Sequence, residues 1–322
     1  MADVSKLPLA ETVFDDDQGS TQGGRDRIVI LGRRASGKTV YLSVLYEKFW
    51  KSLDSLTLKA VSGNAYSDLI RVVEGLREGR WPAATLETQY CDLEIKYKGR
   101  KHLMVTLDYA GESFRRAFVE DITDTPETAT LVEHIDAAAA VILLIDPVSL
   151  VGDSSDARID DDFGMTQAVT RIRNWPGGKD IPFVVVFTKA DVNSLRIHRD
   201  GGVVPFMTKH LPALARTLKK VQIFQVAAVN AETLPDGTKI SSADKLGWHV
   251  EKPLFYCLDQ IELKAELDLH SAQQRRSRVA WAERQKEQRN EQRRTRLRVF
   301  AIVASMIVIA ACIIALIWAR KL

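Results

Sequence analysis

The sequence contains few of the residues that build disulfides and metal centres. Its 322 residues include three cysteines and six histidines. Cys91, Cys257 and Cys312 lie far apart and form no C-x-x-C pair, and the histidines lack a spacing typical of metal ligands. We therefore expect neither a disulfide framework nor a zinc site, and we expect a reducing compartment for the body of the chain.

The first 24 residues lack an apolar run, so we expect no signal peptide. They carry the acidic run Asp15-Asp16-Asp17 and end at Gly23-Gly24. Residues 1–24 are therefore predicted to form a disordered leader. The rest of the chain shows no internal repeat.

Charge is distributed unevenly along the chain, although the formal net charge is only +3. Residues 1–270 contain 33 basic and 39 acidic residues, whereas residues 271–322 contain 12 basic and 3 acidic residues. A mildly acidic body is thus joined to a strongly basic tail. This asymmetry predicts that the tail has a partner of its own, either an anionic membrane or nucleic acid.

Short apolar runs alternate with helical patterns along the body. Strands are predicted at residues 27–32, 56–61, 89–97, 102–108, 139–146, 181–188 and 221–227, and helices at 37–50, 65–78, 162–175, 204–219 and 243–269. This alternation predicts an α/β fold, with helices on both faces of a mostly parallel sheet of about six strands. The hairpin around Lys98-Gly99-Arg100 adds one antiparallel strand.

The strongest motif is GRRASGKT at residues 32–39, which matches G-x-x-x-x-G-K-[ST]. Its glycines allow backbone N–H groups to approach phosphate oxygens, and the following helix contributes the positive end of its dipole. Lys38 is expected to reach the β- and γ-phosphates, and the Thr39 hydroxyl to ligate Mg²⁺. The predicted phosphate-binding residues are Gly32, Arg33, Arg34, Ala35, Ser36, Gly37, Lys38, Thr39 and Val40.

Two further motifs follow predicted strands, at the sheet edge where ligands bind in open α/β sheets. Asp108 and Gly111 form D-x-x-G, in which the carboxylate can hold the Mg²⁺ shell through water and the glycine N–H can meet the γ-phosphate. Thr188, Lys189 and Asp191 form T-K-x-D, and a carboxylate at Asp191 can accept both the N1 and N2 hydrogens of guanine.

The last predicted strand ends at Ala227 and Ala228. Two alanines after a strand are a weak signal of a nucleotide site, and they support one here only because they follow the other motifs in order. We expect the backbone N–H of Ala228 to reach the guanine O6, and we place both alanines in the nucleotide site.

With these motifs in this order, the chain resembles the Ras-like GTPases of the translation-factor-related class over about residues 27–269. Within that class it looks most like bacterial double-GTPase-type domains, on the segments GRRASGKTVYLSVLY, GRWPAAT and DYAGESF. The resemblance implies a three-layer P-loop GTPase fold over residues 25–269 that binds GTP or GDP with Mg²⁺. It also implies slow hydrolysis and two conformations set by the γ-phosphate, through which an unidentified protein effector would be recruited.

Some positions depart from the pattern of this class. The mobile threonine that closes on Mg²⁺ is expected at Thr85, with Thr88 as the alternative, and both threonines could instead merely flank a strand. Glu112 follows Gly111 where many relatives have Gln; it could act as a weak base or repel the γ-phosphate. Lys38, Gly111 and Glu112 form the predicted catalytic set. Arg34 is either a surface arginine or a residue that supplies charge to the transition state in cis.

An uncharged apolar run of 21 residues lies at 299–319, between Arg298 and Arg320. At about 1.5 Å per residue a helix of this length spans a hydrocarbon core of about 30 Å, so we predict a transmembrane helix followed by a short basic tail, 320–322. Ten basic residues precede it within 275–298 and two follow it. The positive-inside rule therefore predicts a C-terminal anchor with the GTPase domain in the cytoplasm.

The segment 270–298 is predicted to be a basic helical stalk, with Glu283, Glu287 and Glu291 at i,i+4 spacing. Nucleic-acid binding is the less favoured interpretation, since Trp281 is its one aromatic residue. The sequence thus predicts a membrane-anchored GTP-binding switch. The alternatives are a non-hydrolysing nucleotide-binding scaffold and a nucleic-acid tether.

Overall fold

The computed structural model describes residues 27–33, 35–52, 56–82, 89–108, 116–118, 120–151, 155–174, 177–233, 239–242 and 247–319. The chain divides into two compact units, residues 1–261 and 262–322. The predicted leader, 1–24, and the predicted closing tail, 320–322, lie outside the described residues.

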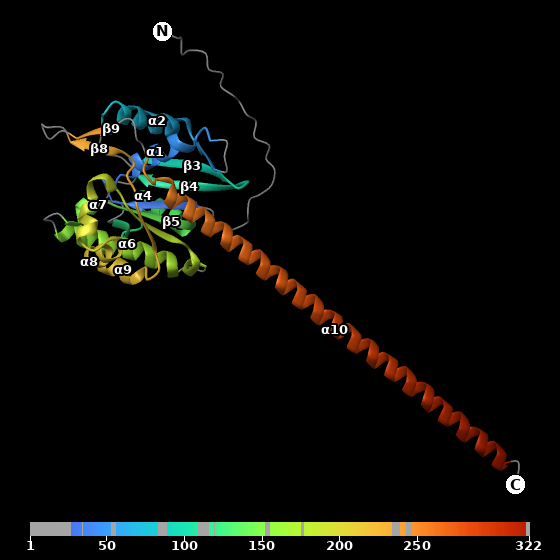
Figure 1. Ribbon diagram of the computed structural model, residues 1–322. Coiled ribbons are helices and arrows are strands. Elements are labelled where there is room, and N and C mark those ends of the chain that lie inside the picture. Colours follow the sequence, from blue (N-terminus) through green and yellow to red (C-terminus); the bar gives the residue numbers. More distant parts are fainter. Residues whose placement is uncertain are drawn as a thin grey trace, which may run out of the picture. The chain divides into compact units, whose positions relative to one another are not determined.

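A seven-stranded sheet forms the centre of the first unit, in the order β2-β3-β4-β1-β5-β6-β7 (Figure 1). The strands are β1 (Arg27–Gly32), β2 (Leu56–Ala60), β3 (Gln89–Tyr97), β4 (Arg100–Asp108), β5 (Ala138–Ile145), β6 (Phe183–Phe187) and β7 (Gln222–Gln225). Strand β3 runs antiparallel to β2 and β4, and the remaining neighbours pair in parallel. The prediction of a mostly parallel sheet with one antiparallel strand is confirmed, with seven strands in place of about six.

Helices follow most of the strands, as the crossover connections of a parallel sheet require. They are α1 (Lys38–Phe49), α2 (Gly63–Arg77), α4 (Pro126–Asp136), α5 (Pro147–Val151), α6 (Ser155–Asn174), α7 (Ala190–Arg199), α8 (Val203–His210), α9 (Pro212–Thr217) and α10 (Glu251–Ala319). A short 3₁₀ turn covers Gly178–Asp180, and a small antiparallel hairpin is formed by β8 (Asn230–Thr233) and β9 (Lys239–Ser242).

The three-layer arrangement follows from the apolar strands, whose successive side chains point to opposite faces of the sheet. On one face Ile28 and Ile30 pack with α1, α2 and the first turns of α10. On the other face Val29 and Leu31 pack with α4, α6, α8 and α9. Because β1, β5 and β6 are buried on both faces, they are nearly continuous apolar runs.

Three predicted helix boundaries are wrong, and two of them have a local backbone cause. The helix predicted at 162–175 begins earlier, at Ser155. The helix predicted at 204–219 is split into α8 and α9, because Pro212 lacks the N–H that would continue α8 and Leu211 leaves the helical conformation. The helix predicted at 243–269 begins only at Glu251, since Gly247 and His249 have positive φ values of 86° and 60°. Helices α4, α5 and α7 and the β8–β9 hairpin were not among the predicted elements.

The first turns of α10 belong to the first unit. Leu254, Cys257 and Leu258 are fully buried there, and Lys48 Nζ lies 2.9 Å from Glu251 Oε2. The Tyr97 hydroxyl and Lys98 Nζ donate to Asp259 Oδ1 at 2.8 and 2.9 Å. These contacts fasten the start of α10 to α1 and to the β3–β4 hairpin.

The second unit consists of the continuation of α10 from residue 262. Within the part of the chain that the structure describes, no helix has a stretch both long and apolar enough to cross a membrane. The side chains of residues 307–319 lie outside that part, so the predicted transmembrane helix at 299–319 falls largely on undescribed side chains.

Candidate nucleotide-binding site

The loop between β1 and α1 has a conformation that depends on its glycines. A Cβ atom at Gly32 would lie 2.5 Å from Ser36 Oγ and 2.7 Å from the Leu144 carbonyl oxygen, too close for any other residue. Gly37 has φ +90°, and Ala35 also lies in the left-handed region. Since glycine adopts positive φ without steric cost, the loop can turn sharply and present its backbone to a ligand.

Helix α1 begins directly after this loop. Gly37 occupies its N-cap position and has no side chain to satisfy the first N–H groups, and the first turn has no acidic residue. Such a helix start attracts anions, because the first N–H groups of the helix point in the same direction as the positive end of its dipole. The loop and the helix together therefore fit a phosphate group.

Lys38 is almost completely buried, with 3% of its surface exposed. Its ammonium group donates to the carbonyl oxygens of Gly32 at 2.8 Å and Arg33 at 3.0 Å. The lysine thus bridges the start of the loop from the first turn of α1. Its positive charge lies at the loop, where the charge of a polyphosphate would be compensated.

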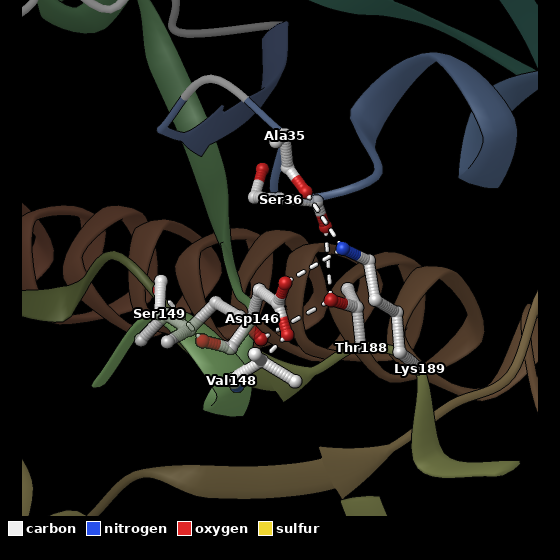
Figure 2. A network of polar contacts seen from close by, with 8 residues as sticks. Ala35, Ser36, Asp146, Val148, Ser149, Thr188 and Lys189 are labelled. Atoms are coloured by element: carbon white, nitrogen blue, oxygen red, sulfur yellow. Dashed lines mark hydrogen bonds and ion pairs between the residues drawn. The ribbon is translucent and has the colours of Figure 1, made fainter. Parts of the chain in front are cut away.

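The segment after β6 is fastened to the same loop (Figure 2). Thr188 Oγ1 donates to the Ser36 carbonyl oxygen at 2.9 Å. Lys189 Nζ donates to the Ala35 carbonyl oxygen at 3.1 Å and lies 2.6 Å from Asp146 Oδ2. The predicted T-K-x-D and phosphate-loop motifs are therefore in direct contact, although they are about 150 residues apart in the sequence.

Asp146 is part of this network but was not among the predicted site residues. It follows β5, is 8% exposed, and its second carboxylate oxygen accepts the Val148 N–H at 3.0 Å (Figure 2). An acidic residue directly after the apolar run AAAVILLI was a visible signal, since parallel strands end at the same edge of the sheet.

A cavity of about 340 Å³ adjoins the loop. It is lined by Gly37, Val40, Tyr41, Trp81, Thr188, Lys189, Asp191, Val192, Val226, Ala228 and Val229. Sites that bind small molecules typically have volumes of about 300–1,000 Å³ and apolar walls with a few polar groups. Here the apolar wall has the carboxylate of Asp191, in the first turn of α7, as its acidic group.

Two further features of the wall bear on its chemistry. Trp81, which is 41% exposed, lines the cavity and was not among the predicted site residues. Burial raises the pKa of the Tyr41 hydroxyl above its ordinary value, so this residue is a neutral part of the wall. A partly aromatic cavity whose wall carries the carboxylate of Asp191 fits a base that offers hydrogen-bond donors.

Ala227 and Ala228 follow β7. Ala228 lines the cavity, and its carbonyl oxygen accepts the Gly247 N–H at 2.9 Å. Ala227 exchanges two backbone hydrogen bonds with Trp248, at 3.1 and 2.8 Å. The segment after β7 is therefore held in place by the chain just before α10, and the expectation that the Ala228 N–H meets a base stays a prediction.

The predicted magnesium ligands are described only in part. Thr39 lies in the first turn of α1, and Asp108 is the last residue of β4, which pairs in parallel with β1. The Asp108 side chain and the residues Arg34, Thr85, Thr88, Gly111 and Glu112 lie outside the described residues. Over the described ranges, no group of three or more His, Cys, Asp or Glu residues could hold a metal ion.

Comparison with known proteins gives one family. The family model of Double-GTPase 2 matches residues 26–245. No curated protein matches the chain.

Two similar solved structures have low identity. The Methanosarcina barkeri Roco2 RocCORdC structure bound to GDP is 15% identical, with a TM-score of 0.29, and the match covers 63% of this chain and 43% of that chain. Translation elongation factor SelB from Methanococcus maripaludis with the GTP analogue GppNHp is 13% identical, with a TM-score of 0.28 and coverages of 63% and 30%. The chain thus spans less than half of the length of either protein.

Proposed function

This chain belongs to the Double-GTPase 2 family, and from that premise we propose that it is a GTP-binding protein that hydrolyses GTP slowly and acts as a switch at a membrane. The binding of GTP or GDP, with Mg²⁺ as the usual metal ion, follows from the family. Hydrolysis, the roles of single residues, and the membrane are the further steps of the proposal.

The observation that carries the proposal is the joining of the cavity to the phosphate loop through Thr188 and Lys189. The base and the phosphates of a nucleotide are a fixed distance apart, so the cavity and the phosphate loop must be held at a matching distance. Thr188 and Lys189 connect these two parts of the site. Asp191 would accept the N1 and N2 hydrogens of guanine, a donor pair that adenine lacks. This supports guanine over adenine as the bound base.

The residues of the loop would bind the phosphates. Lys38 would pair with the β- and γ-phosphates, and the N–H groups around Gly37 would surround their oxygens. Thr39, Asp108 and Thr85 are the residues proposed to hold Mg²⁺, directly or through water. The ion would neutralise charge on the β- and γ-phosphates when it is bound.

Slow hydrolysis is proposed because of Glu112, which follows Gly111 in the segment after β4. A carboxylate there would be repelled by the γ-phosphate and would orient the attacking water poorly. Arg34 in the loop would partly offset that charge if it reached the γ-phosphate.

Single-turnover hydrolysis of Mg²⁺–GTP by the full-length protein tests this proposal. We expect a slow, measurable rate, a faster rate for Glu112→Gln, and a lost rate for Lys38→Ala because binding is lost. A Glu112→Gln rate below wild type would make Glu112 the base. An absence of turnover in wild type and Glu112→Gln would leave a nucleotide-binding scaffold.

The nucleotide state is proposed to act on the segments around Thr85 and after Asp108. These segments would bind the γ-phosphate and Mg²⁺, so their conformation would differ between GTP and GDP. An effector protein would then bind the GTP form at this surface. An effector that bound the GDP form equally well would contradict this step.

Attachment to a membrane is proposed from the chemistry of residues 262–319. Large apolar side chains are exposed on α10, among them Phe300 at 79%, Ile302 at 60% and Met306 at 66%. Exposed apolar surface of this extent is typical of a contact with lipid or protein. The uncharged sequence that continues to residue 319 favours lipid.

Six of the ten basic residues between 275 and 298 lie on one side of α10. At about 100° per residue, these six fall within an arc of about 80°. This basic stripe consists of Arg275, Arg278, Lys286, Arg289, Arg293 and Arg296, and all six are exposed. Basic residues beside an anionic lipid surface contribute about 1 kcal/mol each.

Flotation of the full-length protein with liposomes tests the attachment. We expect flotation with liposomes containing phosphatidylserine, and none for a variant that ends at Arg298 with neutral phosphatidylcholine liposomes. If wild type stayed in the soluble fraction with both kinds of liposome, the membrane part of the proposal would be wrong.

A further inference from the structure

The cavity wall that follows β7 is held by a later part of the chain. After Ala228 the chain leaves the edge of the sheet, forms the β8–β9 hairpin, and comes back at Gly247 (Figure 1). There Ala227 and Trp248 exchange two backbone hydrogen bonds, and the Gly247 N–H donates to the Ala228 carbonyl oxygen at 2.9 Å. Three backbone hydrogen bonds therefore fix this part of the wall.

The returning segment is itself fixed against α1. Gly247 has a φ of +86°, and a Cβ atom there would lie 3.2 Å from Val44 Cγ1 and from Val250 Cγ2. Val250 and Leu254 are fully buried in the same core cluster as Val44. Gly247 thus combines a left-handed backbone with a close approach to α1, and both features favour glycine at this position.

Helix α1 is therefore a common reference for both parts of the nucleotide site. Its first turn follows the phosphate loop and carries Lys38, and Val44 in its second turn lies beside Gly247. Gly247 in turn holds Ala228, which lines the cavity. Because the base and the phosphates of a nucleotide are a fixed distance apart, the path from α1 through Gly247 to Ala228 sets where the base can lie.

We infer that Gly247 and Trp248 are positioning residues for the bound base, acting through the backbone of Ala227 and Ala228. The inference rests on the proposed guanine site and adds to it the chain just before α10. A change at Gly247 should weaken the binding of a guanine nucleotide. The binding of phosphate alone, which needs only the phosphate loop, should stay the same.

Gly247→Ala in the full-length protein tests this inference. The added methyl group meets Val44 and Val250 and alanine is strained at positive φ, so the segment should shift away from α1. Competition with a fluorescent GDP analogue at saturating Mg²⁺ compares GTP with tripolyphosphate, which has no base. We expect the variant to bind GTP about five- to tenfold more weakly than wild type, and tripolyphosphate within about twofold of wild type.

Gly177→Ala is the matched control. Gly177 also has a positive φ, +75°, but a Cβ atom placed there meets open space among the described residues, and Gly177 does not line the cavity. The backbone strain is similar, so this variant should lose stability while its affinity for GTP stays that of wild type. Equal losses of GTP affinity in the two variants would come from strain alone and would overturn the inference.

Hydrogen exchange of the wild type gives a second test that does not depend on the folding of a variant. The amides of Gly247 and Trp248 donate to Ala228 and Ala227, so a base that holds this wall should slow their exchange. Mass spectrometry of a peptide that spans both amides measures the rate. At saturation we expect exchange to be at least about threefold slower with GDP than with tripolyphosphate. The same rate with both ligands would overturn the inference.

The outcomes are separable from those of the proposed function. If wild type bound ATP as well as GTP, the guanine site itself would be wrong, whatever the result with Gly247→Ala. If wild type preferred GTP and Gly247→Ala bound GTP as tightly as wild type, only the positioning inference would fail. An equal loss for GTP and tripolyphosphate would place the effect of Gly247 in the phosphate loop and would also overturn the inference.

Discussion

Lys189 Nζ lies 2.6 Å from Asp146 Oδ2 and donates at the same time to the carbonyl oxygen of Ala35 at 3.1 Å (Figure 2). The ion pair thereby joins three segments of the sheet edge: the phosphate loop after β1, the end of β5 and the end of β6. Asp146 is nearly buried, whereas the Lys189 side chain is 42% exposed. Lys189 also lines the cavity, and its ammonium group is held at the loop.

Asp146→Asn is expected to weaken GTP binding about fivefold. The amide keeps an acceptor for the Val148 N–H but loses the charge that holds Lys189, a contribution of about 1 kcal/mol for a partly exposed pair. Isothermal titration calorimetry with GTP measures the change.

Asp200→Asn is the matched control for this substitution. Asp200 also pairs with a lysine, Lys209, at 2.5 Å, but it lies between α7 and α8 and does not line the cavity. The Asp200→Asn variant should bind GTP with the same affinity as wild type. Equal losses in the two variants would mean that the effect comes from stability and not from the position of Lys189.

Asp191→Asn is expected to exchange the preferred nucleotide. The amide can donate to the oxygen that xanthine carries in place of the guanine amino group, whereas it can no longer accept both guanine hydrogens. GTP affinity should fall by about tenfold or more and XTP affinity should rise. Competition binding with the two nucleotides measures both. A variant that still prefers GTP would remove Asp191 from base recognition.

Trp81→Ala is expected to weaken nucleotide binding about five- to tenfold. The half-exposed indole lines the cavity, and contact between an aromatic ring and a base contributes about 1–3 kcal/mol. The quenching of tryptophan fluorescence on GTP binding should also be reduced. Trp281→Ala, which removes an exposed indole of α10, is the control and should leave both readouts unchanged.

His134 gives a pH dependence of stability. Burial and the Arg27 charge hold its pKa below the ordinary value of 6.5, although Asp92 and Glu133 oppose this. Arg27 Nη1 lies 2.6 Å from His134 Nδ1, which suits a neutral ring. The unfolded chain therefore binds a proton at a higher pH than the folded protein. This contribution to stability is complete above about pH 6.5 and is lost as the pH falls below it.

The measurement is the free energy of unfolding in urea between pH 7.5 and 5.5. His134→Gln should show a smaller decrease over this range than wild type, since it removes the titrating group. His198→Gln, which alters an exposed histidine of α7, should follow the wild-type curve. If all three proteins had the same pH dependence, His134 would not be its source.

The phosphate loop was predictable because its signal is local. A buried strand, a glycine-containing turn and a helix start lie within residues 27–49, and each has its own sequence pattern. The contact of Lys189 with Asp146 depends instead on the strand order, which places β5 between β1 and β6. No pattern along the chain gives that order, so the contact itself was not predictable, although the position of Asp146 directly after an apolar strand was a usable signal.

Some helices begin with a capping signal that the spacing of apolar residues does not reveal. Helix α4 begins with Pro126 after Thr125, whose hydroxyl accepts the Thr128 N–H at 3.3 Å. Asp162 lies within α6 and accepts the N–H groups of Ala213 and Leu214 at the start of α9, at 2.9 and 2.8 Å. Such a cap is a tertiary contact and has no sequence signature.

The central claim is that the cavity beside the phosphate loop selects guanine. Equilibrium competition between GTP and ATP for the full-length protein with Mg²⁺ tests it most directly. A site built around the guanine N1 and N2 hydrogens should bind GTP about a hundredfold or more tightly than ATP. Equal affinity for the two nucleotides would contradict the account.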